Sequence, residues 1–166
     1  METKNFFVLD TSVLFNALYS KILLDLNFTD LISGDVIIPK PALDEIRRNA
    51  NPLRLKNGDK REKYLAQRAI EILPKIEKKL RTKEWRCAMC TKSPKGYFWR
   101  RLRKNAQEFS LSEADLQIAS VAICFQNNGY RNNEDRIVKL LTLDKELANF
   151  AKKNGIESPN LFFKKK

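Results

Sequence analysis

Short apolar runs alternate with amphipathic segments along this chain. The apolar run at residues 5–9 predicts a buried strand, and the polar residues after it predict a turn that leads into a helix over residues 13–18. A second helix is expected over residues 21–32, ending at Ser33 and Gly34. A strand at residues 36–38 and a proline-flanked helix over residues 42–48 follow. The first third of the chain is therefore expected to consist of strands joined by helices.

A long amphipathic helix is expected over residues 60–81. Its apolar residues recur at helical spacing, and the opposite face is basic. Pro74 lies inside this segment and is expected to kink or split the helix. Residues 82–109 have no regular period and predict a loop-rich excursion with a short helix.

The last third returns to alternating elements. An apolar helix is expected from Ser112 to about residue 125, ended by residues 127–129. A strand at residues 137–143, a helix at residues 144–153 and a short strand at residues 160–163 follow. This alternation predicts an α/β fold with a central parallel sheet covered on both faces, an α/β/α sandwich. We find no linker, so residues 1–166 are expected to form a single domain.

The net charge of +12 is concentrated in one region of the chain. Residues 46–109 contain 20 Lys or Arg and only 6 Asp or Glu, and the remainder is slightly acidic. A concentrated basic region favours binding to nucleic acid, with an acidic protein partner as the alternative. Aromatic residues also alternate with cations at residues 92–101, which is typical of a surface that stacks bases and contacts phosphates. The alternative is that Phe98 and Trp99 anchor this segment to the core. The candidate RNA contacts are Lys60, Lys63, Lys78, Arg81, Lys95, Arg100 and Arg101.

Composition excludes several classes of function. The chain has no histidine, which excludes histidine-based hydrolases and histidine-ligated zinc sites. Its three cysteines predict no disulfide framework and indicate a reducing compartment. The longest apolar runs are too short to span a membrane, and the N-terminus lacks a signal-peptide pattern, so a cytoplasmic location is expected.

Four acidic residues follow the predicted strands or begin helices. Asp10 follows the first strand, Asp144 follows the late strand, Glu45 lies one turn into the helix after the second strand, and Asp115 lies in the first turn of the apolar helix. In open parallel sheets the functional cleft lies beyond the carboxyl ends of the strands. Clustered carboxylates repel one another unless a cation neutralises them, and oxygen-only ligands suit Mg²⁺ or Mn²⁺.

Each acid also has a purely structural explanation. Asp10 and Asp144 are suitable helix caps, and Asp115 could form a capping box with Ser112. Glu45 could be one solvated acid on a basic helix, where the neighbouring Asp44 competes for any role. Capping alone does not require these acids to converge.

In these positions the sequence resembles the PIN domain family of small metal-dependent ribonucleases. The similar segments are residues 8–12, Glu45 after residues 37–39, residues 111–119, residues 141–144, and the helix at residues 145–153 with its ending at residues 154–156. The resemblance covers nearly the whole chain except residues 52–108, a basic insertion.

This resemblance implies a cleft in which Asp10, Glu45, Asp115 and Asp144 bind Mg²⁺ or Mn²⁺. It implies that the hydroxyls of Thr11 and Ser12 support the first acid and that Thr142 plays a similar part near the last. The implied activity is endonucleolytic hydrolysis of RNA, since a divalent metal lowers the pKa of bound water and neutralises charge on the scissile phosphate.

The long basic insertion favours an RNA-processing nuclease acting on ribosomal or other structured RNA. One alternative is the ribonuclease toxin of a type II toxin–antitoxin pair, with an antitoxin as partner. Another is a non-catalytic RNA-binding or assembly module, with a ribosome-assembly partner.

Cys87 and Cys90 form a CxxC pair, which is half of a tetrahedral zinc site. Cys124 lies in the apolar helix and is expected in the core. Two such pairs from a homodimer would complete a zinc site. The alternatives are a local redox disulfide and two ordinary thiols.

Overall fold

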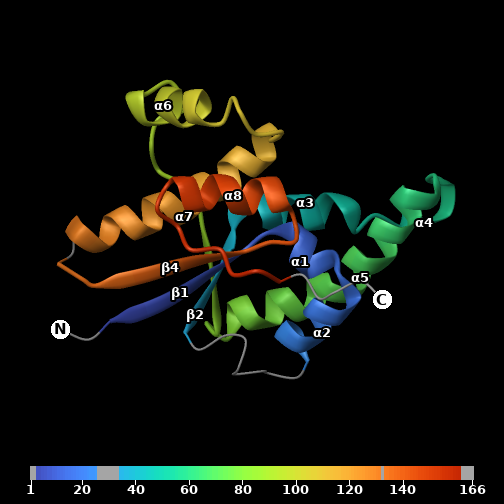
Figure 1. The fold of residues 1–166 in the computed structure, drawn as a ribbon. Coiled ribbons are helices and arrows are strands. Elements are labelled where there is room, and N and C mark those ends of the chain that lie inside the picture. Colours follow the sequence, from blue (N-terminus) through green and yellow to red (C-terminus); the bar gives the residue numbers. More distant parts are fainter. Residues whose placement is uncertain (1–2, 26–33, 132, 162–166) are drawn as a thin grey trace.

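Four parallel strands form the centre of the protein. The computed structural model describes residues 3–25, 34–131 and 133–161. The strands are β1 (Lys4–Leu9), β2 (Asp35–Pro39), β3 (Trp85–Ala88) and β4 (Arg136–Leu141), in the spatial order β3-β2-β1-β4 (Figure 1). All the strand pairs are parallel. The predicted α/β fold with a central parallel sheet is confirmed.

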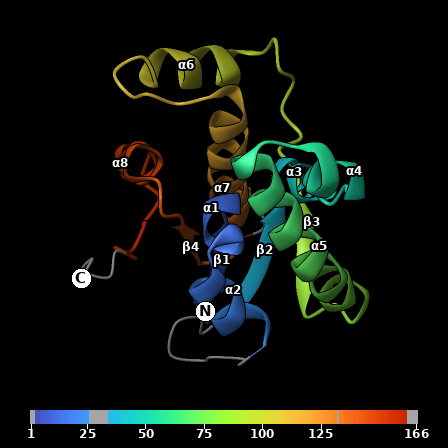
Figure 2. The same cartoon turned by 90° about the vertical axis from the view of Figure 1, so that its right-hand side faces the viewer.

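Helices lie on both sides of this sheet. They are α1 (Thr11–Phe15), α2 (Ala17–Leu24), α3 (Lys40–Asn49), α4 (Pro52–Asn57), α5 (Lys60–Arg81), α6 (Tyr97–Asn105), α7 (Glu113–Arg131) and α8 (Lys145–Lys153). In Figure 1, α7 and α8 lie on one side of the strands and α2 and α5 on the other. Figure 2 shows α6 standing apart from the sheet, beyond the start of α7. None of these described helices has the length and apolar composition needed to cross a membrane.

The central strands are apolar on both faces because helices cover both faces. Every residue from Phe6 to Leu9 is buried, and Ile37 and Ile38 of β2 are fully buried. A strand buried on both sides appears as an unbroken apolar run rather than an alternating one. This is why the predictions at residues 5–9 and 36–38 match β1 and β2.

The first helical segment is divided at Asn16. The Asn16 backbone is extended, and its side chain accepts hydrogen bonds from the N–H groups of Leu18 and Tyr19. The predicted helix over residues 13–18 is therefore interrupted at Asn16: α1 ends at Phe15 and α2 begins at Ala17. The predicted helix over residues 21–32 overlaps α2, and its part at residues 26–32 lies outside the described residues.

Two helices continue past residues that were expected to interrupt them. Helix α5 is unbroken across the exposed Pro74, so the predicted split is wrong. The buried Ile72 and Ile76 hold both sides of the proline against the core, which outweighs one lost backbone hydrogen bond. Helix α7 runs past the predicted stop at residues 127–129. The Gln126 side chain bonds β4 at the Arg136 carbonyl and the Val138 amide, and this anchors the last turns.

The insertion contains more regular structure than its sequence indicates. Helix α4 and strand β3 were not predicted, and β3 pairs with β2, with Trp85 opposite Val36. Trp85 is the only buried residue of β3, so the sequence of this strand shows no alternating or continuous apolar pattern.

The predicted last strand is also incorrect where the structure describes it. Residues 160 and 161 are not in a strand, and residues 162–163 lie outside the described residues. Glu157 instead forms an isolated parallel bridge with Lys139, and its carbonyl accepts a 2.8 Å hydrogen bond from the Leu140 amide.

Candidate active site

The topology predicts that functional residues gather where β1 and β4 end. After β1 the chain forms β2 on one side of β1, and β4 later pairs with β1 on its other side. The strand order therefore reverses between β1 and β4. Asp10 directly follows β1, and Thr142 directly follows β4. The Asp10 amide donates to the Leu141 carbonyl at 3.0 Å, which holds the two strand ends together.

Two hydroxyl groups hold the Asp10 carboxylate. Its Oδ2 accepts hydrogen bonds from Ser12 Oγ and Thr142 Oγ1, each at 2.7 Å. These hydroxyls in turn accept the backbone N–H groups of Leu143 and Asp144, each at 3.0 Å. Each hydroxyl proton is therefore directed at the carboxylate. Asp10 is only 4% exposed, and its side chain does not cap α1, so the capping explanation for this residue is wrong.

Burial makes the ionised form of Asp10 unfavourable. Removal from water is the main cause that raises the pKa of this carboxyl group, and the negative charge of Asp115 raises it further. The hydrogen bonds from Ser12 and Thr142 act in the opposite direction because they stabilise the anion. The network thus partly offsets the cost of a buried charge.

Glu45 shares this environment from helix α3. Its side chain is half-buried, and Thr11 Oγ1 donates a long hydrogen bond of 3.4 Å to Oε1. Burial raises the pKa of Glu45, and the charges of Asp10 and Asp115 add to the shift. Thr11 and the nearby Arg48 lower it. Asp10, Glu45 and Asp115 therefore repel one another in a common electrostatic environment.

Asp115 and Asp144 each cap a helix with a single oxygen. Asp115 Oδ2 accepts the Ser112 amide at 3.1 Å, and Ser112 Oγ accepts the Asp115 amide at 3.1 Å. Asp144 Oδ1 accepts the amides of Glu146 and Leu147 at 2.9 and 3.2 Å. The capping explanations are confirmed for both residues. Asp115 Oδ1 and Asp144 Oδ2 accept no hydrogen bond from the described residues, so each keeps one uncommitted oxygen.

The donor set fits a hard divalent cation, although the acids are not gathered around one point. In the described part of the chain, no three or more Asp, Glu or Cys side chains are arranged to hold a metal ion. The donors are carboxylate and hydroxyl oxygens, which are the ligands that Mg²⁺ and Mn²⁺ prefer. The mutual repulsion of three acids, one of them buried, is what a bound cation would relieve.

Comparison with protein families decides the classification. The PIN domain family matches residues 7–161, which includes all four strands from Phe7 onward and all four acids. The chain belongs to the PIN domain family. PIN domains are typically metal-dependent nucleases that act on nucleic acid. A comparison with curated proteins gives no match to this sequence.

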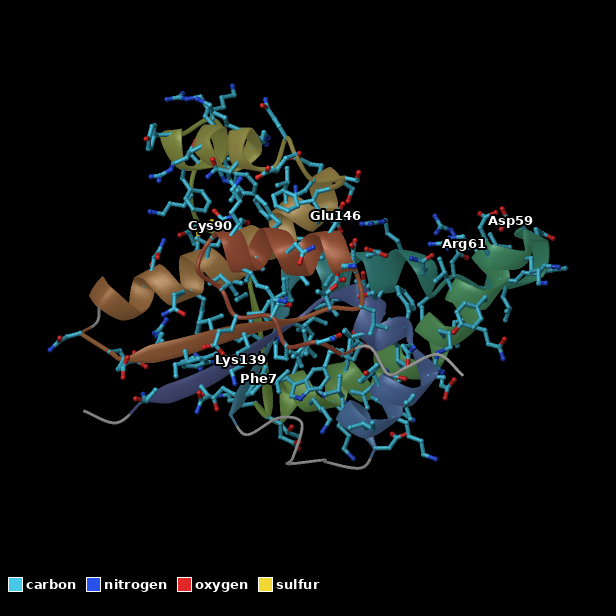
Figure 3. The ribbon with its side chains drawn as sticks, viewed as in Figure 1. Phe7, Asp59, Arg61, Cys90, Lys139 and Glu146 are labelled. Atoms are coloured by element: carbon cyan, nitrogen blue, oxygen red, sulfur yellow. A yellow bond between two sulfur atoms is a disulfide. The ribbon has the colours of Figure 1, made fainter. Side chains whose placement is uncertain are left out.

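The cations that were predicted to contact RNA lie on separate surfaces of the PIN domain. All seven are exposed, and none forms an ion pair with a described residue. Lys60 and Lys63 begin α5, and Lys78 lies 18 residues beyond Lys60, or about 27 Å along the helix axis. Figure 3 shows Arg61, beside Lys60, at the end of α5 that lies beyond the carboxyl ends of the strands. Lys60 and Lys63 are therefore nearer the acids at the strand ends than Lys78 and Arg81.

Tryptophan 99 anchors the segment around α6. It is 5% exposed, and its indole N–H donates to the Lys92 carbonyl at 3.2 Å. The structure thus favours the anchoring explanation for Trp99, whereas the cations Arg100 and Arg101 face outward.

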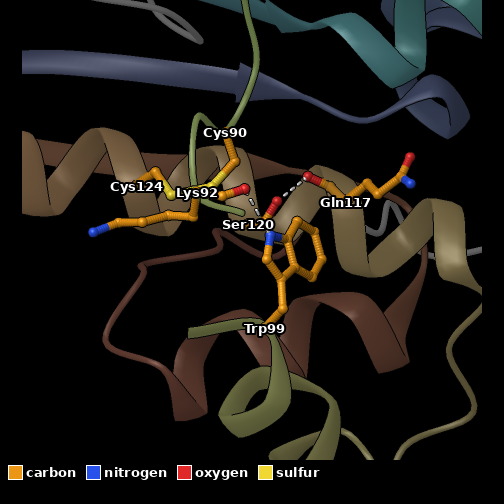
Figure 4. The surroundings of a disulfide bond; sticks show 6 residues. All are labelled: Cys90, Lys92, Trp99, Gln117, Ser120 and Cys124. Carbon is orange, nitrogen blue, oxygen red and sulfur yellow. Dashed lines mark hydrogen bonds between the residues drawn. A yellow bond between two sulfur atoms is a disulfide. The ribbon is translucent and has the colours of Figure 1, made fainter. Parts of the chain in front are cut away.

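The cysteines pair differently from the expectation. Cys90 forms a disulfide with Cys124 of α7, and Cys87 is free (Figure 4). A local disulfide between Cys87 and Cys90, one of the alternatives above, is therefore excluded in this structure, and the expectation that the three cysteines form no disulfide is wrong. Side chains three residues apart in an extended segment point to opposite faces, so Cys90 faces α7 while Cys87 lies beside Leu43 and Arg47. Cys124 is buried in the core as expected.

Sequence reasoning missed one residue beside the acids. Arg48 lies one helical turn after Glu45, and its charge lowers the pKa of that carboxyl group. The spacing of three residues on one helix was an available signal. Among the described residues, the Arg48 side chain forms no hydrogen bond or ion pair, so its charge remains available to an anion.

Proposed function

We propose that this PIN domain is a Mg²⁺- or Mn²⁺-dependent endoribonuclease that hydrolyses RNA phosphodiester bonds. One observation carries the proposal: the Asp10 carboxylate is buried at the ends of β1 and β4, with the charges of Glu45 and Asp115 nearby. Such an arrangement costs folding free energy without a cation. Helix capping does not explain it, because the Asp10 side chain forms no capping hydrogen bond to α1.

The four acids have distinct parts in this proposal. Asp10, Glu45 and Asp115 form the main ligand set, and Asp144 adds its uncommitted Oδ2 from the start of α8. When bound, a divalent ion supplies Lewis-acid chemistry, which activates water and neutralises charge on the scissile phosphate. Asp115 and Asp144 keep their capping oxygens engaged, so the helix termini fix the direction of the remaining oxygens.

The hydroxyl groups orient the central acid. Ser12 and Thr142 donate to the same oxygen of Asp10, and both are fixed by backbone amides of the segment after β4. They stabilise the ionised form of Asp10 and restrict its rotation. They are positioning residues in this proposal, as is Thr11 for Glu45.

The basic insertion supplies contacts to the RNA backbone. Its exposed, unpaired cations suit phosphates, and those at the start of α5 are closest to the acids. We propose that residues 1–166 act as one domain in RNA processing, with residues 52–108 as the RNA-binding insertion. A toxin role is less well supported, because the insertion exceeds what the compact toxins of this family carry.

Cleavage of a labelled single-stranded RNA tests the proposal. The wild-type protein should cleave with Mn²⁺ or Mg²⁺ and not in EDTA, and Asp10→Asn should abolish cleavage. Asp25→Asn is a matched control, because Asp25 only pairs with Lys75 on the surface. Mn²⁺ should also raise the melting temperature of the wild type and of Asp25→Asn, but not of Asp10→Asn.

The cleavage readout separates the remaining possibilities. If the wild type cleaves no RNA with either ion, the enzyme proposal fails, and a non-catalytic RNA-binding module becomes the better account. If Asp10→Asn cleaves as fast as the wild type, the assigned site is wrong.

A further inference from the structure

A pocket of about 360 Å³ lies beside the acidic site. It is formed by α3, the segment at residues 89–94, the start of α6 and the first half of α7. This volume is at the lower end of the range for pockets that bind small organic groups. It therefore suits one such group rather than a folded partner.

The pocket and the acidic site share two helices. On α3, Asp44 and Arg48 line the pocket, while Glu45 between them belongs to the acidic site. On α7, Ala114 and Gln117 line the pocket on either side of Asp115. Adjacent residues have Cα atoms 3.8 Å apart, so the two sites occupy neighbouring faces of the same helices. A strand with a phosphate at the acids would bring the next nucleotide to this pocket.

The lining combines cations with apolar surface. The charged residues of the lining are three cations, Lys40, Arg48 and Lys92, and one acid, Asp44. The pocket therefore carries a net positive charge. Trp99 lines one wall and is held by its bond to the Lys92 carbonyl, and Met89 is 59% exposed. Apolar and aromatic side chains accommodate a base, and cations accommodate the phosphates on either side of it.

The lining contains two neutral residues with polar side chains, Ser120 and Gln117. The Ser120 hydroxyl already donates a hydrogen bond within α7, whereas the Gln117 side-chain amide is available to a ligand. Gln117 accepts the Ser120 hydroxyl at its backbone carbonyl, but its side-chain amide bonds no described residue. Figure 4 shows the Trp99 ring of α6 beside α7 near Ser120, with the Gln117 side chain extending from the same part of α7 to the side away from Trp99. A glutamine amide offers one acceptor and one donor side by side, which match the N6 and N7 positions of adenine.

We propose that this pocket binds one RNA base next to the scissile phosphate and that Gln117 selects adenine there. The proposal rests on the ribonuclease function proposed above. Adenine at this position should be preferred over uracil by about tenfold, which is the scale of one bidentate amide contact. Cleavage should therefore concentrate at positions next to adenines in unstructured RNA.

Tryptophan fluorescence tests binding without requiring cleavage. The chain has two tryptophans, so Trp85→Phe leaves Trp99 as the single reporter. Titration in EDTA with short oligoadenylate should quench Trp99 more strongly, and at lower concentration, than oligouridylate. Gln117→Leu should remove the difference between the two oligonucleotides. Gln67→Leu, an exposed glutamine on α5, should keep it. If Trp85→Phe fails to fold, the indole N–H signal of Trp99 in the NMR spectrum of the wild type gives the same comparison.

Mapping of cleavage sites separates this proposal from the proposed function. On one RNA of mixed sequence, the wild type should cut mainly next to adenines, and Gln117→Leu should lose this preference. Gln67→Leu should keep both the wild-type rate and the wild-type preference. If the wild type cuts with no adenine preference, or if Gln117→Leu keeps that preference, the pocket proposal is overturned while the ribonuclease function stands. If no RNA is cut, the ribonuclease function fails, and the titration alone decides the pocket: equal quenching by both oligonucleotides, or none, overturns it.

Discussion

Replacing Thr142 with valine tests the hydrogen-bond network that holds Asp10. Valine keeps the shape of threonine but removes the hydroxyl, and Thr142 is only 3% exposed, so water cannot readily replace it. Two interactions are lost: the 2.7 Å bond to Asp10 Oδ2 and the 3.0 Å bond from the Asp144 amide. A hydrogen bond to a charged group contributes about 1.5–3 kcal/mol, and a buried amide left without an acceptor costs about 1 kcal/mol or more. The unfolding free energy should therefore fall by about 3 kcal/mol.

The loss should depend on pH, because the Thr142 bond stabilises ionised Asp10 and lowers its pKa. Near pH 3, below the ordinary Asp10 pKa of 3.8, the carboxyl group is protonated in the folded and unfolded states, and only neutral hydrogen bonds are lost. Near pH 7 the charge-assisted bond is lost as well, so the cost is larger. Urea unfolding in EDTA at both pH values measures this difference. Thr91→Val, at an exposed position, should change stability by no more than about 0.5 kcal/mol. Equal costs at the two pH values, or a cost as small as that of Thr91→Val, would refute the network.

Three further outcomes follow from the same structure. Without metal, burial disfavours ionised Asp10, so the unfolding free energy falls as pH rises from 3.8 through the raised pKa of Asp10. The variant Asp10→Asn should therefore raise the melting temperature near pH 7 and leave it unchanged near pH 3. The disulfide between Cys90 and Cys124 closes a loop with a sequence separation of 34, which corresponds to about 4 kcal/mol of unfolding free energy. Cys90→Ser should lose this amount in oxidising buffer and much less with a reductant, as measured by urea unfolding. Replacing Lys60 and Lys63 together with alanine should reduce the salt dependence of single-stranded RNA binding, with a slope smaller by about 1.4, as measured by fluorescence anisotropy.

Each of these three predictions would be contradicted by a specific result. A lower melting temperature of Asp10→Asn near pH 7 in EDTA would mean that the carboxylate stabilises the metal-free fold. A reductant-independent loss in Cys90→Ser would indicate a packing defect rather than a lost cross-link. An unchanged salt slope in the lysine double variant would remove the start of α5 from the RNA path.

The sequence predicts those parts of the fold whose environment is uniform along a strand or helix. Strand β1 is covered on both faces, so its burial leaves a continuous apolar run that ends at Asp10. The position of Asp10 in the cleft then follows from the parallel sheet. The same reasoning fails for β3, because an edge strand with one buried residue, Trp85, carries no pattern. Its place is fixed by backbone pairing with β2, which the side chains do not encode locally.

Long-range contacts are the other part that the sequence does not reveal. The CxxC spacing left a shared zinc site, a local disulfide and two ordinary thiols open, whereas the partner of Cys90 is Cys124, on a helix that follows the whole excursion around α6. In the sequence, Gln117 lies within the segment 111–119 that resembles the PIN family, and nothing there indicated a role for its side chain. Its relation to Trp99 arises because α6 folds back over α7, which brings both side chains into one pocket.

Capping and metal binding are compatible roles for the same carboxylate. Asp144 gives one oxygen to two amides of α8, and Asp115 gives one oxygen to the Ser112 amide, so each retains a second oxygen. A capped carboxylate cannot rotate freely, which lowers the entropy cost of binding an ion with its other oxygen. The helix N-terminus also favours a negative charge at this position. The Asp10 side chain caps no helix. Its rotation is restricted instead by the hydrogen bonds from Ser12 and Thr142. In a chain without histidine, these two devices orient the carboxylate oxygens that a hard divalent ion would need as ligands.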